Sequence, residues 1–156
     1  MKKIYIGLVH GRMNSLYGEI NAPIRRAAGS IMLREVHPDG ALALTIWREL
    51  HYFAISDVSL LRFELITGRT HQIRVHCREA GCPLIGDGLY GRMADPDRYS
   101  GDLCRLDTLV GRQALHAASL TLTHPETGQE IRLTAPLPDD FRELMAELFR
   151  VSRDFS

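Results

Sequence analysis

The strongest constraint on the fold is a strand-like run that ends near a glycine and is followed at once by a helix-like run. Residues 58–66 are rich in apolar and β-favouring side chains, which predicts a strand. Thr70 stands where a helix N-cap residue is expected, and Gly81 stands where a left-handed residue ends a helix. These signals predict an α-helix from His71 to Ala80. A strand, a tight turn and a short helix are therefore expected at the centre of the chain.

Basic side chains gather around the start of this predicted helix. Ile73, Cys77 and Ala80 recur at the i, i+4 and i+7 positions of one buried stripe. Arg74 lies off that stripe, and Arg69 lies in the turn before the helix. A helix N-terminus is positive because of its unpaired backbone N–H groups and the helix dipole, and the arginines add to that potential. The turn and helix are therefore expected to favour an anion.

The composition is that of an ordinary globular protein that forms one domain over residues 1–156. The 45% hydrophobic residues suffice for a sizeable core, and the formal net charge of zero excludes a global basic field. The 19 basic residues include only two lysines, Lys2 and Lys3. The planar fork of arginine suits phosphates and base edges, which fits an RNA-facing surface, although compositional drift in a GC-rich genome explains the same bias.

The cysteines and the apolar runs bear on location and metal binding. Cys77, Cys82 and Cys104 form an odd set without zinc-ligand spacing, which indicates reduced thiols in a cytoplasmic protein. No apolar run reaches the length of a membrane helix, and no signal-peptide pattern opens the chain. A zinc site built from His71, His76 and Cys77 is not expected, because residues five apart on a helix point in different directions.

The remaining elements predict an α+β fold, a mostly antiparallel sheet with two main helices. Further strands are predicted over Ile4–Val9, Ala43–Trp47, Leu50–Ile55, Leu115–Thr123 and Glu130–Ala135, the last two as a hairpin. Pro138 begins a final helix whose apolar residues recur with helical spacing. The polar segment from Arg92 to Gly111 is expected to be a mobile surface loop. In the first strand, Tyr5 faces away from the main apolar side.

Several blocks of the sequence resemble one family, in that family's own order. TGRTHQIRVH (Thr67 to His76), followed by GCPLIGDGLYG (Gly81 to Gly91), is similar to the third motif of the RluA-type pseudouridine synthases. RQALHAASLTLTHPETGQEI (Arg112 to Ile131) and KKIYIGLVHG (Lys2 to Gly11) resemble two further blocks. The resemblance implies part of a pseudouridine synthase catalytic domain, which isomerises uridine in ribosomal or transfer RNA without a cofactor or a metal.

The resemblance also implies roles for individual residues. Arg74 would keep a catalytic aspartate ionised, Tyr5 would stack near the target uracil, and Leu115 would line the uracil pocket. The other substrate-binding residues that it implies are Thr67, Gly68, Arg69, His71 and Gln72. From the residues alone, Tyr5 is more simply a half-buried strand tyrosine, and Leu115 a core leucine at the start of a strand.

The catalytic aspartate is expected to be missing from this chain. The family carries it in a His-Arg-Leu-Asp motif upstream of the tyrosine strand, and Met1 falls after that point. We therefore expect the later portion of a catalytic domain, with Arg74 deprived of its carboxylate. An unpaired buried arginine costs on the order of 3 kcal/mol or more, so it needs another acid, an anion or water. Asp107, in Cys-Arg-Leu-Asp-Thr, is a poor substitute because it follows the arginine motif.

Three functions fit these observations. The chain is interpreted first as part of an RNA pseudouridine synthase, and otherwise as a non-catalytic RNA-binding remnant or an interaction domain. Isomerisation of uridine by the chain alone is not expected. An uncovered apolar edge or face of the sheet is expected to promote self-association.

Overall fold

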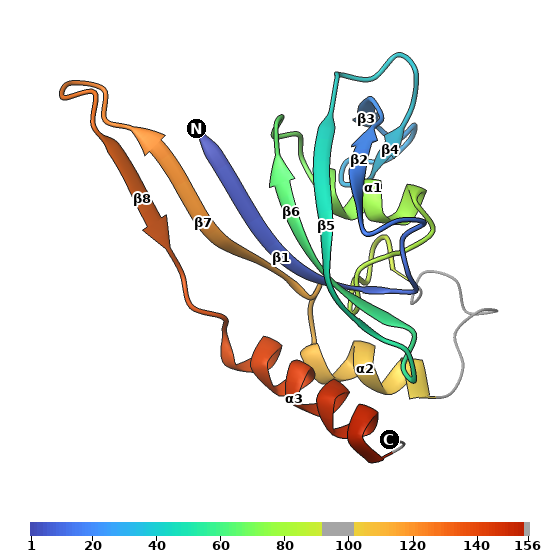
Figure 1. Cartoon of the computed structure of the whole chain (residues 1–156). Helices are drawn as coiled ribbons and strands as arrows, with labels where there is room; N and C mark the ends of the chain where they lie inside the picture. Colours follow the sequence, from blue (N-terminus) through green and yellow to red (C-terminus); the bar gives the residue numbers. More distant parts are fainter. Residues whose placement is uncertain (92–101, 155–156) are drawn as a thin grey trace.

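The computed structural model of the chain describes residues 1–91 and 102–154 and confirms an α+β fold. Six strands form one antiparallel sheet in the order β2-β5-β6-β1-β7-β8, and β3 pairs with β4 beside it (Figure 1). The strands are β1 (Lys2–His10), β2 (Tyr17–Asn21), β3 (Ile24–Arg26), β4 (Arg34–Val36), β5 (Leu44–Phe53), β6 (Val58–Leu65), β7 (Leu115–Thr123) and β8 (Glu130–Thr134). The helices are α1 (Gln72–Glu79), α2 (Asp102–Val110) and α3 (Asp139–Asp154).

Strand β1 runs through the middle of the sheet and packs on both of its faces. Ile6 and Leu8 pack against a cluster that includes the α3 residues Phe141, Leu144 and Leu148. Tyr5 and Val9, which alternate with them, pack in a different cluster that includes Ile73 and Cys77 of α1. The sheet therefore separates two hydrophobic cores, with α3 on one side and α1 on the other (Figure 1).

Gly7 lies two residues after Tyr5 in β1, where side chains of the α1 core come close to the backbone. A Cβ atom at Gly7 would lie 3.0 Å from Phe63, 3.1 Å from Leu84 and 3.2 Å from Leu115. These distances are tighter than ordinary contacts, so a side chain at Gly7 would require Phe63, Leu84 and Leu115 to move by a few tenths of an ångström.

Strand β5 replaces two strands that the sequence predicts separately, over Ala43–Trp47 and Leu50–Ile55. It is continuous from Leu44 to Phe53, with a bulge between Glu49 and His51. A bulge adds one residue to one strand, so the alternation of faces shifts by one. Trp47 consequently packs in the α1 core while Phe53 packs in the α3 core, although both stand at odd-numbered positions.

Helix α1 begins and packs differently from the prediction. Its N-cap is His71, which has a left-handed backbone (φ 58°), and no side chain caps the helix, so Thr70 is not the N-cap. Ala80 is exposed instead of buried, because the inward face consists of Gln72, Ile73, Val75, His76 and Cys77. The expected helix end is confirmed, since Gly81 has φ 74°.

Helix α2 falls in the segment that the sequence analysis assigned to a mobile surface loop. Residues 92–101 lie outside the described part of the chain, but 102–110 form a helix, so the loop prediction is wrong there. Leu106 and Val110 are buried in the α3 core. Their apolar contacts, four residues apart on one helix face, explain why a polar composition still forms a helix.

The two elements predicted at the end of the chain are confirmed. Strands β7 and β8 form the expected hairpin, with Leu120 opposite Leu133 and Leu122 opposite Ile131.

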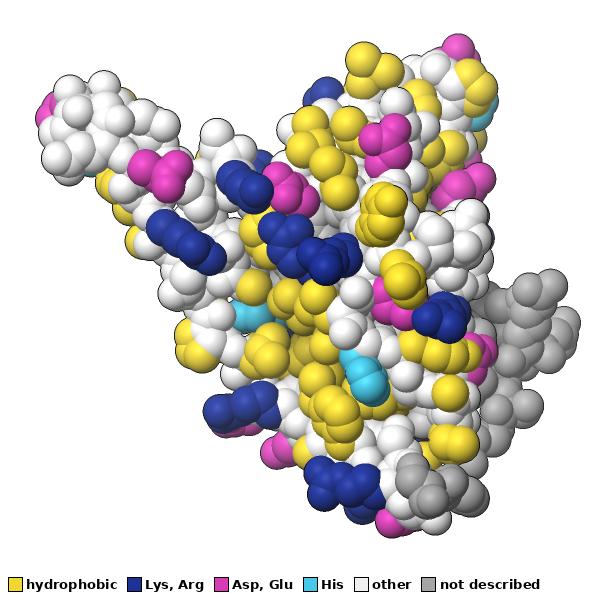
Figure 2. All heavy atoms as spheres, in the orientation of Figure 1, with side chains coloured by type: hydrophobic (Ala, Val, Ile, Leu, Met, Phe, Trp, Pro, Cys, Tyr) yellow, Lys and Arg dark blue, Asp and Glu magenta, His cyan; other side chains and the backbone are white. Residues whose placement is uncertain are grey.

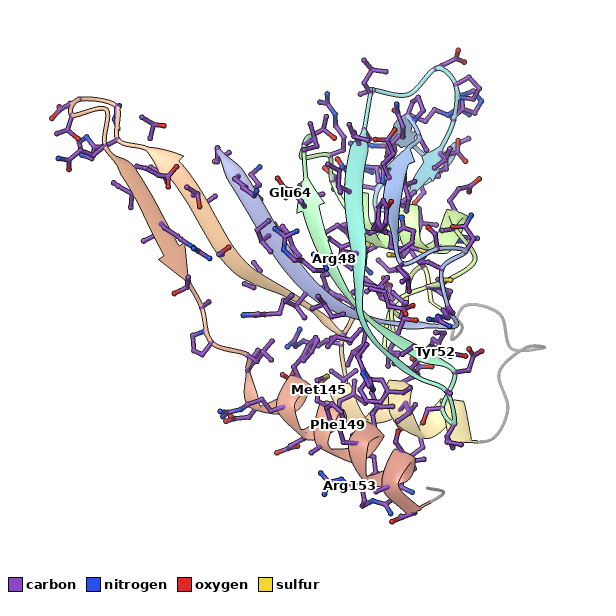
Figure 3. All side chains as sticks on the ribbon, in the orientation of Figure 1. Arg48, Tyr52, Glu64, Met145, Phe149 and Arg153 are labelled. Atoms are coloured by element: carbon purple, nitrogen blue, oxygen red, sulfur yellow. The ribbon has the colours of Figure 1, made fainter. Side chains whose placement is uncertain are left out.

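Helix α3 covers only part of its face of the sheet, and Figure 2 shows hydrophobic and basic side chains side by side over that face. Ile46 is 38% exposed there. Figure 3 shows how Met145 and Phe149 on α3 lie below the strands that carry Arg48 and Glu64.

Helices that could span a membrane are absent from the described residues.

Candidate functional site

The turn between β6 and α1 is held by one buried side chain, Gln72, which is 2% exposed. Its Oε1 accepts hydrogen bonds from the hydroxyl of Thr67 at 2.8 Å and from the backbone N–H of Arg69 at 2.9 Å. Its Nε2 donates to the carbonyl oxygen of Leu44 at 3.1 Å and to the hydroxyl of Thr45 at 2.9 Å. Gln72 and Thr67 therefore fix the shape of the turn, and their polar groups are engaged within the protein.

The sequence analysis expected Arg74 to need another acid, an anion or water in place of the upstream aspartate, and in the structure Asp87 is that acid. Its Nε and Nη2 donate to the two carboxylate oxygens of Asp87 at 2.8 and 2.7 Å. The side chain of Arg74 is 13% exposed, and that of Asp87 is fully buried. The buried arginine thus has the alternative acid that its burial demands.

Asp87 is charged because its hydrogen-bond donors outweigh its burial. Burial alone raises the pKa of a carboxyl, but the hydrogen bonds from Arg74 and from the backbone N–H groups of Tyr90 and Leu89 hold the pKa of Asp87 below its usual range. The same hydrogen bond from Arg74 to Asp87 raises the pKa of Arg74. Tyr90 also stacks its ring on Arg74, with the guanidinium carbon 4.9 Å from the ring centroid.

His71 is oriented by the hydroxyl of Tyr90. The backbone N–H of Arg34 donates to that hydroxyl at 2.9 Å, so the hydroxyl proton is available to His71 Nδ1, also at 2.9 Å. Burial first, and then the positive charges of Arg74 and Arg34, lower the pKa of His71. A neutral ring that accepts at Nδ1 carries its proton on Nε2. His71 therefore offers an N–H donor at Nε2, which has no partner in the described part of the chain.

A cavity of about 170 Å³ brings most of the predicted site residues together. It is lined by Tyr5, Leu65, Arg69, His71, Gln72, Ile73, Arg74 and Leu115. Thr67 and Gly68 lie outside the lining, in the turn behind it. A larger cavity of about 310 Å³ continues on the other side of Tyr5, between the start of β1 and the β7–β8 hairpin. Among the described residues, neither lining contains a carboxylate.

Asp107 lies outside both linings, on α2. Its carboxylate is buried and lies 2.9 and 3.1 Å from Nε2 of His10, and it also accepts a hydrogen bond from the backbone N–H of Gly86. These contacts tie α2 to β1. They explain why an acid occurs in this helix, and they do not favour Asp107 as a substitute nucleophile.

Asp87 and Tyr90 are the site residues that the sequence analysis did not single out. Both lie in GCPLIGDGLYG, the second half of the motif quoted for the resemblance. Nothing in their spacing from Arg74 indicates an ion pair, because the chain between them turns back through irregular structure. The signal available was the buried arginine itself, which required an acid within reach.

The described residues contain no group of three or more histidine, cysteine or acidic side chains that could hold a metal ion. His76, which was not expected to bind zinc, has both ring nitrogens engaged at 2.9 Å, with Thr45 and with the carbonyl of Ala22. Burial lowers the pKa of His76. Cys77 is buried, and its burial raises the pKa of the thiol. Both side chains therefore act in packing.

The chain belongs to the RNA pseudouridylate synthase family, whose family model matches residues 1–79. This match confirms the resemblance drawn from the sequence motifs, and it covers β1, Tyr5 and the whole of α1.

Bacterial pseudouridine synthases align with nearly all of this chain. It is 40% identical over 148 residues to an uncharacterised RNA pseudouridine synthase of Bacillus subtilis, and this alignment covers 93% of this chain and 46% of the relative. It is 43% identical over 132 residues to the ribosomal large subunit pseudouridine synthase D of Haemophilus influenzae, and this alignment covers 84% of this chain and 40% of the relative. The chain thus spans less than half the length of these relatives.

Solved structures support the fold. The human RNA pseudouridylate synthase domain containing 4 superimposes with a TM-score of 0.70 at 23% identity, over 95% of this chain and 62% of that one. The human RNA pseudouridylate synthase domain containing 1 gives a TM-score of 0.67 at 24% identity, over 97% and 65%.

Proposed function

We propose that this chain forms part of an RNA pseudouridine synthase, which converts uridine to pseudouridine in ribosomal or transfer RNA. The reaction breaks the C1′–N1 bond of the nucleotide, turns the base and joins it again through C5. The observation that carries the proposal is the single cavity lined by Tyr5, Arg74 and Leu115, the three residues for which the family resemblance implies a place beside the uracil.

Tyr5 and Leu115 are the proposed contacts of the base. A uridine must leave its stack before a protein can act on its C1′ and C5 atoms, and an aromatic ring compensates for the lost stacking. Tyr5 lines both cavities, so a base inserted at its ring reaches either one. Arg69 and His71 are the proposed polar contacts, because both line the cavity and His71 offers its Nε2–H.

Arg74 is proposed to act on a second carboxylate. Asp87 engages its Nε and Nη2, while Nη1 has no partner in the described chain. A guanidinium has five N–H donors, so Asp87 can orient Arg74 and still leave donors for the catalytic aspartate of the family. A positive charge close to that aspartate would favour its ionised form. Because neither cavity is lined by a carboxylate, the chain of 156 residues is not expected to isomerise uridine alone.

Tritium release from RNA labelled at uridine C5 tests this proposal. The chain is assayed alone and together with a polypeptide that carries the His-Arg-Leu-Asp motif, in both its aspartate and asparagine forms. Turnover is expected only with the aspartate form. Arg74→Gln should abolish it, whereas Arg78→Gln, an exposed arginine in the same helix, should not. RNA binding without turnover in any combination would instead favour a non-catalytic RNA-binding protein.

Self-association and a cytoplasmic location are further parts of the proposal. The face of the sheet beside α3 exposes Ile46 of β5, and α3 itself exposes Phe149, at 38% and 39% exposure. A second copy of the chain could cover them. Light scattering of the wild-type chain and of Ile46→Ser/Phe149→Ser tests this, since the variant should remain monomeric at concentrations where the wild type forms dimers.

A further inference from the structure

A third cavity lies beside the candidate site, and four of its six lining residues are arginines. It has a volume of about 170 Å³ and lies between the β3–β4 hairpin and the turn that precedes α1. Its lining residues are Ile24, Arg25, Arg26, Arg34, Arg69 and Thr70, and we call it the arginine pocket. Four arginines around so small a volume repel one another unless anions neutralise them.

Among the described residues, only one of these four arginines has an acidic partner. Arg25 donates from Nε to Glu35 at 2.8 Å. Nη1 of Arg34 donates to the main-chain carbonyl of Leu33 at 3.2 Å, and Nε of Arg69 donates to that of Leu42 at 2.9 Å. Arg26, Arg34 and Arg69 have no carboxylate partner within residues 1–91 and 102–154. Carbonyl groups position two of these guanidinium groups but leave their charges uncompensated.

Elsewhere in the described chain, arginines are mostly paired with acids. Seven of them form ion pairs with aspartate or glutamate, namely Arg12, Arg62, Arg74, Arg105, Arg112, Arg142 and Arg150. The other arginines without an acidic partner, Arg48, Arg78, Arg132 and Arg153, each lie on a different element. Of the three cavities described, the arginine pocket alone is lined by more than one arginine without an acidic partner among the described residues, so negative charge is lacking there.

The arginine pocket is fixed in position relative to the candidate site. Ile24 packs in one hydrophobic cluster with Val75 of α1 and with Tyr90, and Val36 packs against the same cluster. The hydroxyl of Tyr90 joins the hairpin to the turn, because it accepts from the backbone N–H of Arg34 and contacts His71. The backbone of the hairpin is therefore held at a set distance from α1.

The pocket is also continuous with the candidate site. Arg69 lines both cavities. The charge of Arg34 contributes to lowering the pKa of His71, so the positive potential of the pocket reaches the candidate site. A single polyanion can occupy both.

We propose that the arginine pocket is a phosphate-binding subsite that holds the RNA backbone next to the nucleotide in the candidate site. The inference rests on the proposed function, because it takes the ligand of the candidate site to be a uridine in RNA. Guanidinium groups pair with phosphate oxygens through two parallel N–H donors, which suits three arginines that converge on one cavity. Since the phosphate binds beside an extruded nucleotide, the subsite holds single-stranded or looped RNA.

Two charge-matched double variants test the subsite in the chain as it stands. Arg26→Gln/Arg34→Gln removes two charges from the pocket and leaves Arg69, which lines both cavities, in place. Arg48→Gln/Arg132→Gln removes two charges from β5 and β8, away from the pocket. Thermal unfolding of each variant checks that the fold is retained.

The probe is a fluorescein-labelled single-stranded oligouridine of twelve nucleotides, and its binding is followed by anisotropy at several salt concentrations. The pocket variant should bind about tenfold more weakly, and the slope of log K against log salt should become shallower by about 0.7 for each phosphate that the variant no longer neutralises. The β5/β8 variant should keep the wild-type slope. Equal slopes in the two variants, or no binding by the wild-type chain, would overturn the subsite.

Inorganic phosphate separates an RNA subsite from a site for free phosphate. The subsite predicts that millimolar phosphate displaces the oligouridine no better than chloride of equal ionic strength, because one phosphate lacks the neighbouring contacts. Strong, specific competition that disappears in the pocket variant would instead show a site for free phosphate and overturn the proposal. If the subsite is right but the proposed enzyme function is wrong, the two assays will differ. Oligouridine binding will still weaken in the pocket variant, but no tritium will be released even when the aspartate motif is supplied.

Discussion

The ion pair between Arg74 and Asp87 offers the most direct test of how the site is built. Replacing Asp87 with asparagine keeps an acceptor oxygen and nearly the same shape but removes the charge. It leaves Arg74, whose side chain is 13% exposed, without the acid that pairs with it. Removing one partner of a buried ion pair costs about 3–5 kcal/mol, and partial exposure of Arg74 places the expected cost at the lower end, about 3 kcal/mol.

This destabilisation should be visible in urea unfolding followed by fluorescence. The chain has one tryptophan, Trp47, which is 3% exposed in the α1 core and so reports on the region next to the pair. A decrease of about 3 kcal/mol corresponds to a fall of roughly 6–12 °C in the melting temperature of a chain of this size. The matched control is Asp140→Asn, which breaks the pair of Arg112 and Asp140, whose side chains are 38% and 33% exposed. Water screens that pair, so the control should be destabilised far less.

The pH dependence of stability supplies a second measurement on the same pair. The pKa of Asp87 is lowered in the folded chain, so its contribution to stability is complete above the ordinary aspartate pKa of about 3.9 and is lost as the pH falls through the folded value. Asp87→Asn should therefore show less acid destabilisation than the wild type. If Asp87→Asn unfolds at the wild-type urea concentration, or if Asp140→Asn is destabilised as much, the assigned role of the pair is wrong.

Three other predictions concern neighbouring residues. Gly7→Ala should lower stability by about 1–3 kcal/mol in thermal melts, because the added methyl has no room, and an unchanged melting temperature would contradict the packing described. In NMR titrations the pKa of His71 should lie below about 6.5 in the wild type and should rise in Arg34→Gln, which removes a nearby positive charge. Because the folded chain lowers this pKa, protonation of His71 should destabilise the fold as the pH falls. A pKa at or above about 6.5 in the wild type would refute this. In the tritium assay with the aspartate motif supplied, Tyr5→Phe should retain turnover while Tyr5→Ala should be roughly tenfold to a hundredfold slower, and equal rates would remove Tyr5 from the site.

Local sequence signals predicted those parts of the fold that local physics determines. The strand–turn–helix unit was predictable because Gly81 permits the left-handed backbone that ends a helix and because the apolar spacing indicates a buried helix face. The β7–β8 hairpin was predictable because Leu120 and Leu122 alternate in step with the apolar residues across the turn. In both cases the interactions that decide the structure lie within a short stretch of chain.

Contacts between distant residues decided what the sequence did not predict. The bulge in β5 exists because Trp47 and Phe53 must reach cores on opposite sides of the sheet, which no window of β5 alone can reveal. Helix α2 is held by the α3 core and by the contact of Asp107 with His10, 97 residues away. The pairing of Arg74 with Asp87 likewise depends on how the chain after α1 folds back. The sequence identified the cavity residues through family resemblance, but not the acid that orients the arginine.

The bulge also determines how much length variation β5 can absorb. Glu49 pairs with Leu61 and His51 with Leu60, so Leu50 between them takes no place in the ladder, and its side chain is 47% exposed. Of the ten residues of β5, eight are paired with β6, and Leu50 is passed over between two of them. A deletion of Leu50 would remove the irregularity and leave every other residue opposite its present partner. Deleting a second residue between Trp47 and Phe53 would shift the alternation of faces, because no other unpaired residue lies between them. Either Trp47 or Phe53 would then point toward the wrong side of the sheet.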